Sequence, residues 1–377
     1  MIDVIIPVYK GHAQTRTCID SVLRERQRSP HEVVVIDDAS PEPAITEYLN
    51  ELARNGRITL VRNARNLGFV QSANLGMSLH ADRDVVLLNS DTEVANDWLD
   101  RLHACAHGAP DIATVTPFSN NATICSYPFE GWSGVLPGTL GLAALDRLIA
   151  DTNAGRTVDL PTAVGFCMFI RRDAISQLGA FDAQRFGRGY GEENDFCMRV
   201  LKAGRRNVLA GDVFIFHEGA VSFSEERHAL TRAATQALLE VHPEYTRWVH
   251  EYIIADPANG LRSAIDAARV AQGAEEARHV LDERNEERAR LVRGLWEIET
   301  LAAERDQLKG QVGQLHYGLE HATACITDRD RQIAELRAGL AYAESLAFQR
   351  EKELDRIRRT WVWRALSFAK RWRSRGA

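Results

Sequence analysis

Residues 32–40 read EVVVIDDAS, a short apolar run that ends in two carboxylates and a turn. A run of this kind, bounded by turn residues, is typical of a strand buried in a parallel sheet. Similar runs recur through residues 1–120, separated by segments whose apolar residues have helical spacing. The pattern predicts an α/β fold in which βα units build a parallel sheet. We expect strands at residues 4–7, 32–37, 58–61 and 85–89.

Polar clusters follow three of these strands, at residues 7–9, 37–40 and 89–91. Taken alone, each cluster also fits a turn or a helix cap. Open α/β sheets bind ligands at the carboxyl ends of their strands. Three polar strand ends on one edge therefore indicate a binding site.

A denser cluster lies at residues 189–195, where Glu192, Glu193 and Asp195 follow a glycine-rich approach. Acids at the start of a helix are favoured by the helix dipole, which is one interpretation. The other is a cleft in which one acid takes up protons or faces a cation, because adjacent carboxylates repel and resist burial.

Composition limits the remaining choices. The 377 residues, 45% of them hydrophobic, suffice for one large catalytic domain and an appendage, and a net charge of -6 gives no reason to expect nucleic acid. Six scattered cysteines without a C-x-x-C pair indicate a reducing compartment. We expect no secretory signal at the first residues and no membrane-spanning segment, because no run of 18 apolar residues occurs.

Five motifs carry a resemblance to a known family. They are Ile6 to Tyr9, Val35 to Ser40, Asn66 to Phe69 with Asn74, Leu87 to Asp91, and Gly191 to Asp195. In this order and spacing they resemble family 2 of the inverting glycosyltransferases, over roughly residues 1–255. The likeness is greatest to bacterial rhamnosyltransferase-like enzymes that build surface polysaccharides. It implies a GT-A fold, a Rossmann-like mixed sheet flanked by helices.

The resemblance implies a nucleotide-sugar site, for a dTDP- or UDP-sugar, at the strand ends. Carboxylates there suit ribose hydroxyls and base edges because they accept hydrogen bonds. The residues implied for this site are Pro7, Tyr9, Asp37, Asp38, Asn66, Gly68, Asn74 and Asn89.

The family's D-x-D element reads Asn89-Ser90-Asp91 here, so its first acid is an amide. Asp91 remains to bind a divalent ion that bridges the phosphates, and oxygen ligands favour Mg²⁺ or Mn²⁺. The resemblance makes His217 a second metal ligand, whereas a lone histidine otherwise serves as a structural hydrogen-bonding group. The amide at Asn89 is the feature that favours a catalytically inactive scaffold, the alternative function.

The family's E-D-x-D run implies the catalytic base. Its second position is Glu193, which we rank first, followed by Asp195 and Glu192. Repulsion by neighbouring acids would raise the pKa of Glu193 and favour proton uptake near neutral pH. Asp195 has two further interpretations, as a group that orients the acceptor or as a helix cap.

Acceptor recognition is expected between residues 118 and 161, where Tyr127, Phe129 and Trp132 lie near the amides of Asn120 and Asn121. Flat aromatic faces and fixed donors suit sugars. A structural loop with a small aromatic cluster is the alternative.

After residue 256 the composition shifts to Ala, Glu, Arg and Leu. Alternating four-three spacing from Leu301 to Trp361 defines eighteen core positions, of which fifteen are apolar. This register predicts a coiled coil that self-associates into a homo-oligomer. The predicted divisions are a transferase domain at 1–255, a helical linker at 256–290, a coiled coil at 291–361 and a basic amphipathic tail at 361–377.

From Arg356 onward the chain has eight Lys or Arg and no acid, interleaved with Trp and Phe. A helix of this kind favours the interface of an anionic membrane, with a protein dock and nucleic acid as rivals. Together these features predict a peripheral enzyme on the cytoplasmic face of a bacterial membrane. We expect it to transfer a sugar to a lipid-linked or surface-polysaccharide glycan.

Overall fold

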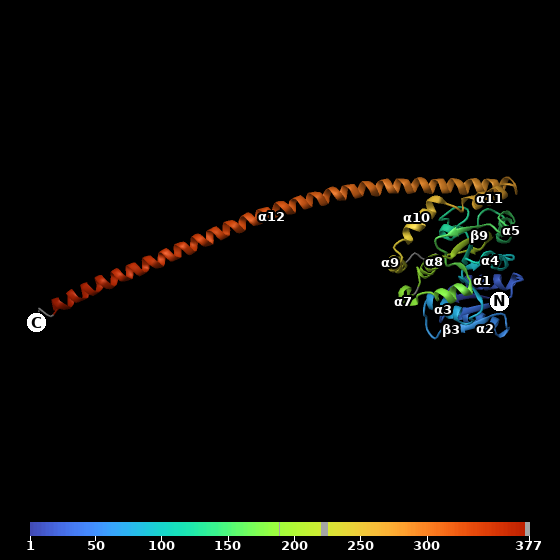
Figure 1. Cartoon of the computed structure of the whole chain (residues 1–377), viewed down its shortest axis with the longest axis horizontal. Helices are drawn as coiled ribbons and strands as arrows, with labels where there is room; N and C mark the ends of the chain where they lie inside the picture. The colour runs from blue at the N-terminus through green and yellow to red at the C-terminus, as the bar shows by residue number, and fades with distance from the viewer. Residues whose placement is uncertain (188, 220–224, 374–377) are drawn as a thin grey trace. The chain divides into compact units, whose positions relative to one another are not determined.

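The computed structural model in Figure 1 describes the backbone of residues 1–187, 189–219 and 225–373. Side chains are described in the same ranges, except at residues 225–230, 357, 358, 360–363, 367 and 371–373. The chain divides into two compact units, Met1–Ala289 and Arg290–Ala377.

The first unit is built around a mixed sheet with the strand order β3-β2-β1-β4-β8-β6-β9-β7. The first four strands of the chain run parallel, as predicted, while β8 is antiparallel to both β4 and β6. A second, two-stranded sheet pairs β5 with β10. The strands are β1 (Ile2–Val8), β2 (His31–Asp37), β3 (Thr59–Arg62), β4 (Asp84–Leu88), β5 (Thr92–Glu93), β6 (Ile112–Phe118), β7 (Thr157–Leu160), β8 (Cys167–Ile170), β9 (Arg206–Phe214) and β10 (Phe216–His217).

Helices flank the large sheet and connect most of its strands (Figure 1). They are α1 (His12–Arg24), α2 (Pro43–Arg54), α3 (Phe69–Ser78), α4 (Trp98–Ala106), α5 (Leu142–Thr152), α6 (Arg172–Leu178), α7 (Ala183–Phe186), α8 (Glu192–Lys202), α9 (Glu225–Val241), α10 (Tyr245–Ala255), α11 (Asn259–Val270) and α12 (Ala274–Arg373), with a 3-10 turn at Thr123–Cys125.

The core lies on both faces of the sheet because successive strand side chains point to opposite sides. Val4 and Ile6 of β1 join the cluster on one face, and Ile5 joins the other with Val34 and Ile36 of β2. A strand covered on both faces reads as a continuous apolar run. This is why the sequence located β1, β2 and β4 to within one or two residues, whereas the short β3 is only partly buried.

The parallel register brings the polar strand ends together. Val8 pairs with Asp37, and Ile5 pairs with Leu87, so β1, β2 and β4 end at the same edge. Residues 7–9, 37–40 and 89–91 follow these ends. The α/β architecture predicted from the sequence is therefore confirmed, including the convergence of its polar clusters.

The first unit extends to Ala289, beyond the boundary at residue 255 that the sequence predicted. Residues 256–289 contain α11 and the start of α12, and α11 packs against α5. Leu261 of α11 lies so close to Gly211 of β9 that an added Cβ there would be 2.8 Å from its Cδ1. Arg262, which is buried, donates to the carbonyls of Ile124 and Ser126.

Arg269 forms a second buried connection. Its guanidinium binds Glu276 and Glu283 at 2.9 and 2.6 Å and donates to the Tyr127 hydroxyl at 3.0 Å. Both glutamates belong to the first turns of α12 and are themselves buried. These turns are thereby part of the first unit, held by paired charges together with the buried side chain of Val280.

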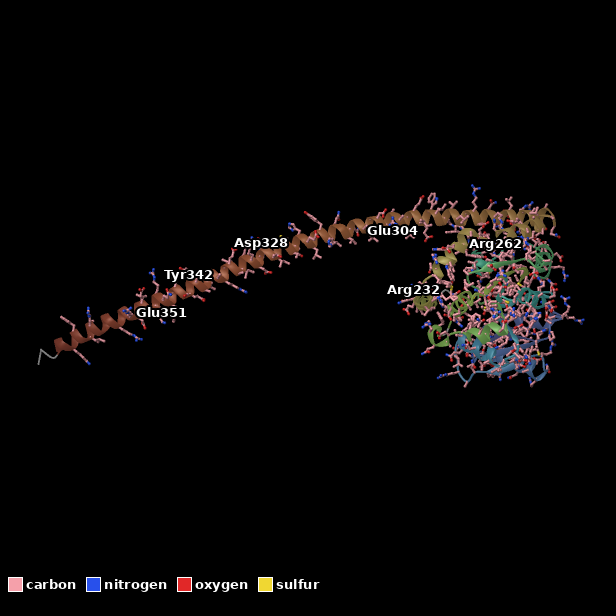
Figure 2. All side chains as sticks on the ribbon, in the orientation of Figure 1. Arg232, Arg262, Glu304, Asp328, Tyr342 and Glu351 are labelled. Carbon is pink, nitrogen blue, oxygen red and sulfur yellow. The ribbon has the colours of Figure 1, made fainter. Side chains whose placement is uncertain are left out.

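The second unit consists of the rest of α12, a long helix that fits the predicted coiled coil. Side chains such as Glu304, Asp328, Tyr342 and Glu351 project from it along its length (Figure 2). The predicted seam is exposed: Leu308, for example, is 59% exposed. No helix among the described residues is both long enough and apolar enough to cross a membrane. Residues 374–377 of the predicted tail lie outside the described part of the chain.

Candidate active site

A cavity of about 630 Å³ opens at the convergent strand ends. It is bounded by the loops after β1, β2 and β4, by the start of α3 and by the residues after β10. Seven of the sequence-predicted site residues line it, namely Pro7, Tyr9, Asp38, Asn66, Gly68, Asn89 and Asp91.

Asp38 fixes one wall of this cavity. Its carboxylate accepts hydrogen bonds from the backbone amides of Leu67 and Gly68, both at 2.8 Å, and from the Asn63 side chain at 2.7 Å. Gly68 has φ +86°, a conformation that glycine adopts without strain, and it leads directly into α3. Asp38 therefore holds the loop that carries Asn66 and Gly68.

Two predicted nucleotide-site residues lie outside the lining of the cavity. The Asp37 carboxylate contacts Arg62 at 3.0 Å, its partner in the β2–β3 register, and accepts from the Ser40 amide at 2.8 Å. Asn74 holds the Phe181 backbone through both ends of its amide. Their polar atoms are engaged by these contacts, and neither residue lines the cavity.

Asp91 lines the cavity and lies next to His217, which precedes the lining residue Glu218. The Nε2 atom of His217 lies 3.4 Å from Oδ1 of Asp91, because β5 and β10 pair next to these residues. The Nδ1 atom of His217 is 2.7 Å from the carbonyl oxygen of Asn121. A carbonyl only accepts, so Nδ1 carries the proton and Nε2 faces Asp91. The imidazole also stacks on Phe166, with ring centroids 5.3 Å apart.

This pair fits a divalent cation by the chemistry of its donors. A histidine that donates its other ring N–H to a carbonyl is the usual arrangement around a metal ligand, since the bond fixes the tautomer. The Asp91 side chain is 27% exposed, which leaves it accessible from the cavity. One carboxylate and one imidazole leave most of the coordination shell to a ligand's oxygens, which suits Mn²⁺ or Mg²⁺.

The three carboxylates of the acidic cluster occupy the first turn of α8 and have different surroundings. Asp195 is buried between Arg199, at 2.9 Å, and the Nε2 atom of His242, also at 2.9 Å. Gly191 takes the N-cap position, so the interpretation of Asp195 as the helix cap is wrong. Asp195 instead joins α8 to the segment between α9 and α10.

Glu192 and Glu193 have raised pKa values. Burial raises the pKa of Glu192 to about 8, and the charge of Glu193 adds to the shift. Burial likewise raises the pKa of Glu193, whose carboxylate accepts from the Gly191 amide at 3.3 Å. Glu193 lines a second cavity of about 200 Å³, together with Tyr190, Asn194 and Tyr245 among others. Of the described residues, none lines both cavities.

Residues 3–179 match the family described as Glycosyl transferase family 2. The chain carries a glycosyl transferase family 2 domain. This match covers the strands that build the cavity, through Asp91, and ends before the acidic cluster of α8.

Relatives share this domain at low identity. The protein y4gI of Sinorhizobium fredii is 25% identical over 71% of this chain and 29% of its own length. An N-acetylglucosaminyltransferase of Azorhizobium caulinodans is 27% identical over 54% of this chain and 51% of its own length. The chain thus spans about half or less of the length of these relatives. A mannosyltransferase from Pyrobaculum calidifontis, solved with GDP-Man and Mn²⁺, aligns with TM-score 0.47 and 18% identity over 75% of this chain and 79% of its own.

The aromatic segment of the family 2 domain departs from its predicted role. Tyr127 and Phe129 are buried, and Phe129 packs edge-on against Trp132 with ring centroids 5.2 Å apart. Asn120 is also buried and clamps the backbone of His217 through both ends of its amide. The prediction that these side chains offer a sugar platform is therefore wrong for Tyr127, Phe129 and Asn120.

Sequence reasoning missed several residues that line the cavity of the domain. Lys10 and Gln14 come from the loop after β1 and the first turn of α1, and Glu218 follows His217. Gln14 donates to Glu218 at 3.1 Å, joining segments 204 residues apart. The available signal for Lys10 and Glu218 was a position one or two residues after a strand end, whereas Gln14 lies within α1.

Proposed function

We propose that this chain transfers a sugar from a nucleoside-diphosphate sugar to a hydroxyl group of a glycan, with inversion at the anomeric carbon. The observation that carries the proposal is the approach of Asp91 to the Nε2 atom of His217, 3.4 Å, at a cavity of about 630 Å³. The family 2 domain supports a glycosyltransferase. The size of the cavity is in the range of small-molecule sites.

In this proposal Asp91 and His217 hold the divalent cation, Mg²⁺ or Mn²⁺. Bound there, the ion would neutralise the charge that develops on the leaving diphosphate. The chain's own contribution is orientation: Asn121 fixes the histidine tautomer, and Asn120 holds the backbone of His217. The strand-end residues Pro7 and Tyr9 would bind the nucleoside of a dTDP- or UDP-sugar.

An inverting transfer also needs a base on the side opposite the diphosphate. Glu193 is our first candidate, because burial raises its pKa toward the range in which a carboxylate accepts a proton at neutral pH. Asp195 ranks second, since Arg199 and His242 engage both of its oxygens. Glu192 ranks third: it is buried, and its Oε2 atom has no hydrogen-bond partner.

The acceptor is proposed to be a lipid-linked or surface-polysaccharide glycan at the cytoplasmic face of a bacterial membrane. The exposed seam of α12 supports self-association, because a single helix would leave this apolar stripe in water. The basic, aromatic sequence of residues 361–377 supports binding to anionic lipid. The side chains of Trp361, Trp363 and Trp372 lie outside the described residues, so their part rests on the sequence.

The alternative is an inactive, transferase-like scaffold that recruits glycan-assembly enzymes through the coiled coil. Asn89, an amide where the family has an acid, favours it. A donor-hydrolysis assay over a panel of nucleotide sugars separates the two. In the enzyme, Asp91→Asn or excess chelator should lower turnover at least a hundredfold, which corresponds to about 2.7 kcal/mol or more in barrier.

The matched control is Asp82→Asn, an exposed acid nine residues from Asp91, which should keep wild-type turnover. The enzyme proposal fails if wild-type protein hydrolyses none of the donors. The metal assignment fails if Asp91→Asn retains full activity.

A further inference from the structure

Three side chains that commonly ligate metals meet at the edge of the sheet opposite the strand-end cavity. Asp84 begins β4, while His103 and His107 stand four residues apart at the C-terminal end of α4. One carboxylate oxygen and one nitrogen from each imidazole all lie within 4.8 Å of one another. The five residues of β4 span about 16 Å, so this cluster is separate from Asp91.

A backbone hydrogen bond orients the Asp84 carboxylate of the cluster. Oδ1 of Asp84 accepts a hydrogen bond from the backbone amide of Arg172 at 2.8 Å. Oδ2 is thereby directed to the Nε2 atom of His107, also at 2.8 Å. A hydrogen bond to the second oxygen of a ligating carboxylate is a usual support of metal sites.

The two imidazoles lie side by side on the same face of the helix. Their ring centroids are 4.7 Å apart, and both rings contact Phe169 of β8. Each imidazole offers one ring nitrogen to the cluster, and the lone pair of such a nitrogen is what a metal requires.

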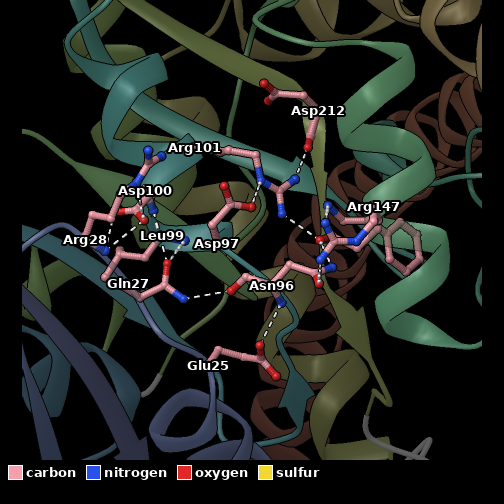
Figure 3. Close-up of polar contacts among 12 residues, drawn as sticks. Glu25, Gln27, Arg28, Asn96, Asp97, Leu99, Asp100, Arg101, Arg147 and Asp212 are labelled. Atoms are coloured by element: carbon pink, nitrogen blue, oxygen red, sulfur yellow. Dashed lines mark hydrogen bonds and ion pairs between the residues drawn. The ribbon is translucent and has the colours of Figure 1, made fainter.

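Helix α4 is itself a fixed support. Asp100 accepts from the backbone amides of Arg28 and Ser29, and Arg101 contacts Asp97 and Asp146 (Figure 3). Sites built on such anchored helices keep their geometry better than sites on loops. The carbonyl end of the helix also carries partial negative charge, which favours a cation.

We propose that Asp84, His103 and His107 form a binding site for a borderline transition-metal ion, with Zn²⁺ the best match. Two imidazole nitrogens and one carboxylate oxygen are a donor set that zinc prefers and magnesium does not. Bonds of about 2.0 Å place tetrahedral ligands about 3.3 Å apart, so small side-chain rotations would close this set on the ion. His107 is 41% exposed, which leaves access for the ion and for a water as fourth ligand.

A second cluster, Asp3, Glu32 and His80, has similar spacing and provides a control. There the Arg83 guanidinium already contacts Asp3 at 2.9 Å and Glu32 at 2.5 Å. A fixed cation between the carboxylates opposes a metal ion by charge repulsion. The first cluster contains no such side chain between its ligand atoms, as far as the described ion pairs show.

The test uses the full chain, stripped of metal by chelator and dialysed. Zn²⁺ at a hundredfold excess over its dissociation constant should raise the unfolding midpoint by about 5–10 °C. His103→Gln and His107→Gln should each weaken this binding at least tenfold, while His80→Gln should bind as wild type does. Co²⁺, titrated in place of Zn²⁺, should give visible absorption bands that both cluster variants lose.

Circular dichroism of the metal-free variants shows whether each one folds. If His103→Gln fails to fold, the more exposed His107→Gln carries the test. The proposal is overturned if Zn²⁺ leaves wild type unchanged, or if the folded cluster variants bind Zn²⁺ and Co²⁺ as wild type does.

Discussion

The two units of this chain differ in the side chains that they bury and expose. Within Met1–Ala289, guanidinium groups such as Arg262 and Arg269 are buried and paired. Within Arg290–Ala377, large apolar side chains such as Leu315 and Leu336 are each 74% exposed. A buried ion pair requires defined geometry, whereas an exposed apolar stripe requires a partner. The first unit has its own core, and we propose that the second unit associates through its exposed apolar stripe.

The largest effect should come from Arg269, which tests whether charges close the first unit. Arg269→Ala leaves Glu276 and Glu283 buried without their partner, so unfolding free energy should fall by about 3–5 kcal/mol. Denaturant unfolding of residues 1–289 measures this loss. Arg278→Ala, an exposed arginine of the same helix, should stay within about 0.5 kcal/mol of wild type. Equal stability of the two variants would contradict the argument.

The next effect concerns turnover within the first unit. Glu193→Gln keeps the shape of the side chain but removes the proton acceptor, so kcat should fall about a hundredfold, or about 2.7 kcal/mol, with donor KM nearly unchanged. Asp195→Asn should instead lower stability, because Arg199 and His242 lose a charged partner. If Asp195→Asn abolishes turnover in a folded protein while Glu193→Gln remains active, the ranking of the two acids is reversed.

An effect spread over several pH units should appear in the pH dependence of stability. The pKa of Glu192 is raised to about 8 by burial, so the folded state keeps a proton that the unfolded state releases near pH 4.5. Between these values unfolding free energy should decline as pH rises, because the folded state binds more protons. Glu192→Gln cannot ionise. Its stability should match wild type near pH 5 and exceed it increasingly up to about pH 8; parallel curves would show that Glu192 does not titrate in this window.

The smallest effect on turnover should follow removal of the second unit. Residues 1–289 should keep turnover within about twofold on a soluble acceptor, because this unit has its own core and site. Full-length protein should be oligomeric and should sediment with anionic vesicles, less at high salt; the shortened chain should do neither. A monomeric full-length chain, or one that ignores such vesicles at low salt, would refute the association and membrane proposals.

The same contrast explains what the sequence could and could not predict. Strands β1, β2 and β4 were predictable because burial on both faces leaves a continuous apolar run. The heptad register of α12 was readable for a similar reason, since a sustained local period needs no knowledge of the fold. The pairing of Asp91 with His217 was predicted from family resemblance, because residues 126 positions apart share no local pattern.

Residues whose partners are distant in sequence were beyond local reasoning. The sequence predicted Asp37 as a carboxylate of the nucleotide site. The β2–β3 register places Arg62 beside it, which no local pattern indicates. The sequence predicted that Tyr127 binds the acceptor. In the structure α11 covers Tyr127, and its hydroxyl donates to Asp266. The first unit likewise continues past residue 255, because α11 packs Leu261 and Ile265 into the core and Arg269 is paired there. In all three cases, contacts between residues far apart in the sequence determine the structure, and local secondary-structure propensity does not reveal them.

The hydrogen bond from His217 to Asn121 has a consequence for how the site could diversify. It settles the orientation of the ring while the protein folds, before any ion or sugar arrives. The conformational entropy of the His217 ring is therefore lost during folding. In the proposed cation site, the binding of a donor sugar does not have to order this ring again. Changes to the loop held by Asp38 could alter which nucleotide sugar fits while the cation's ligands stay in place.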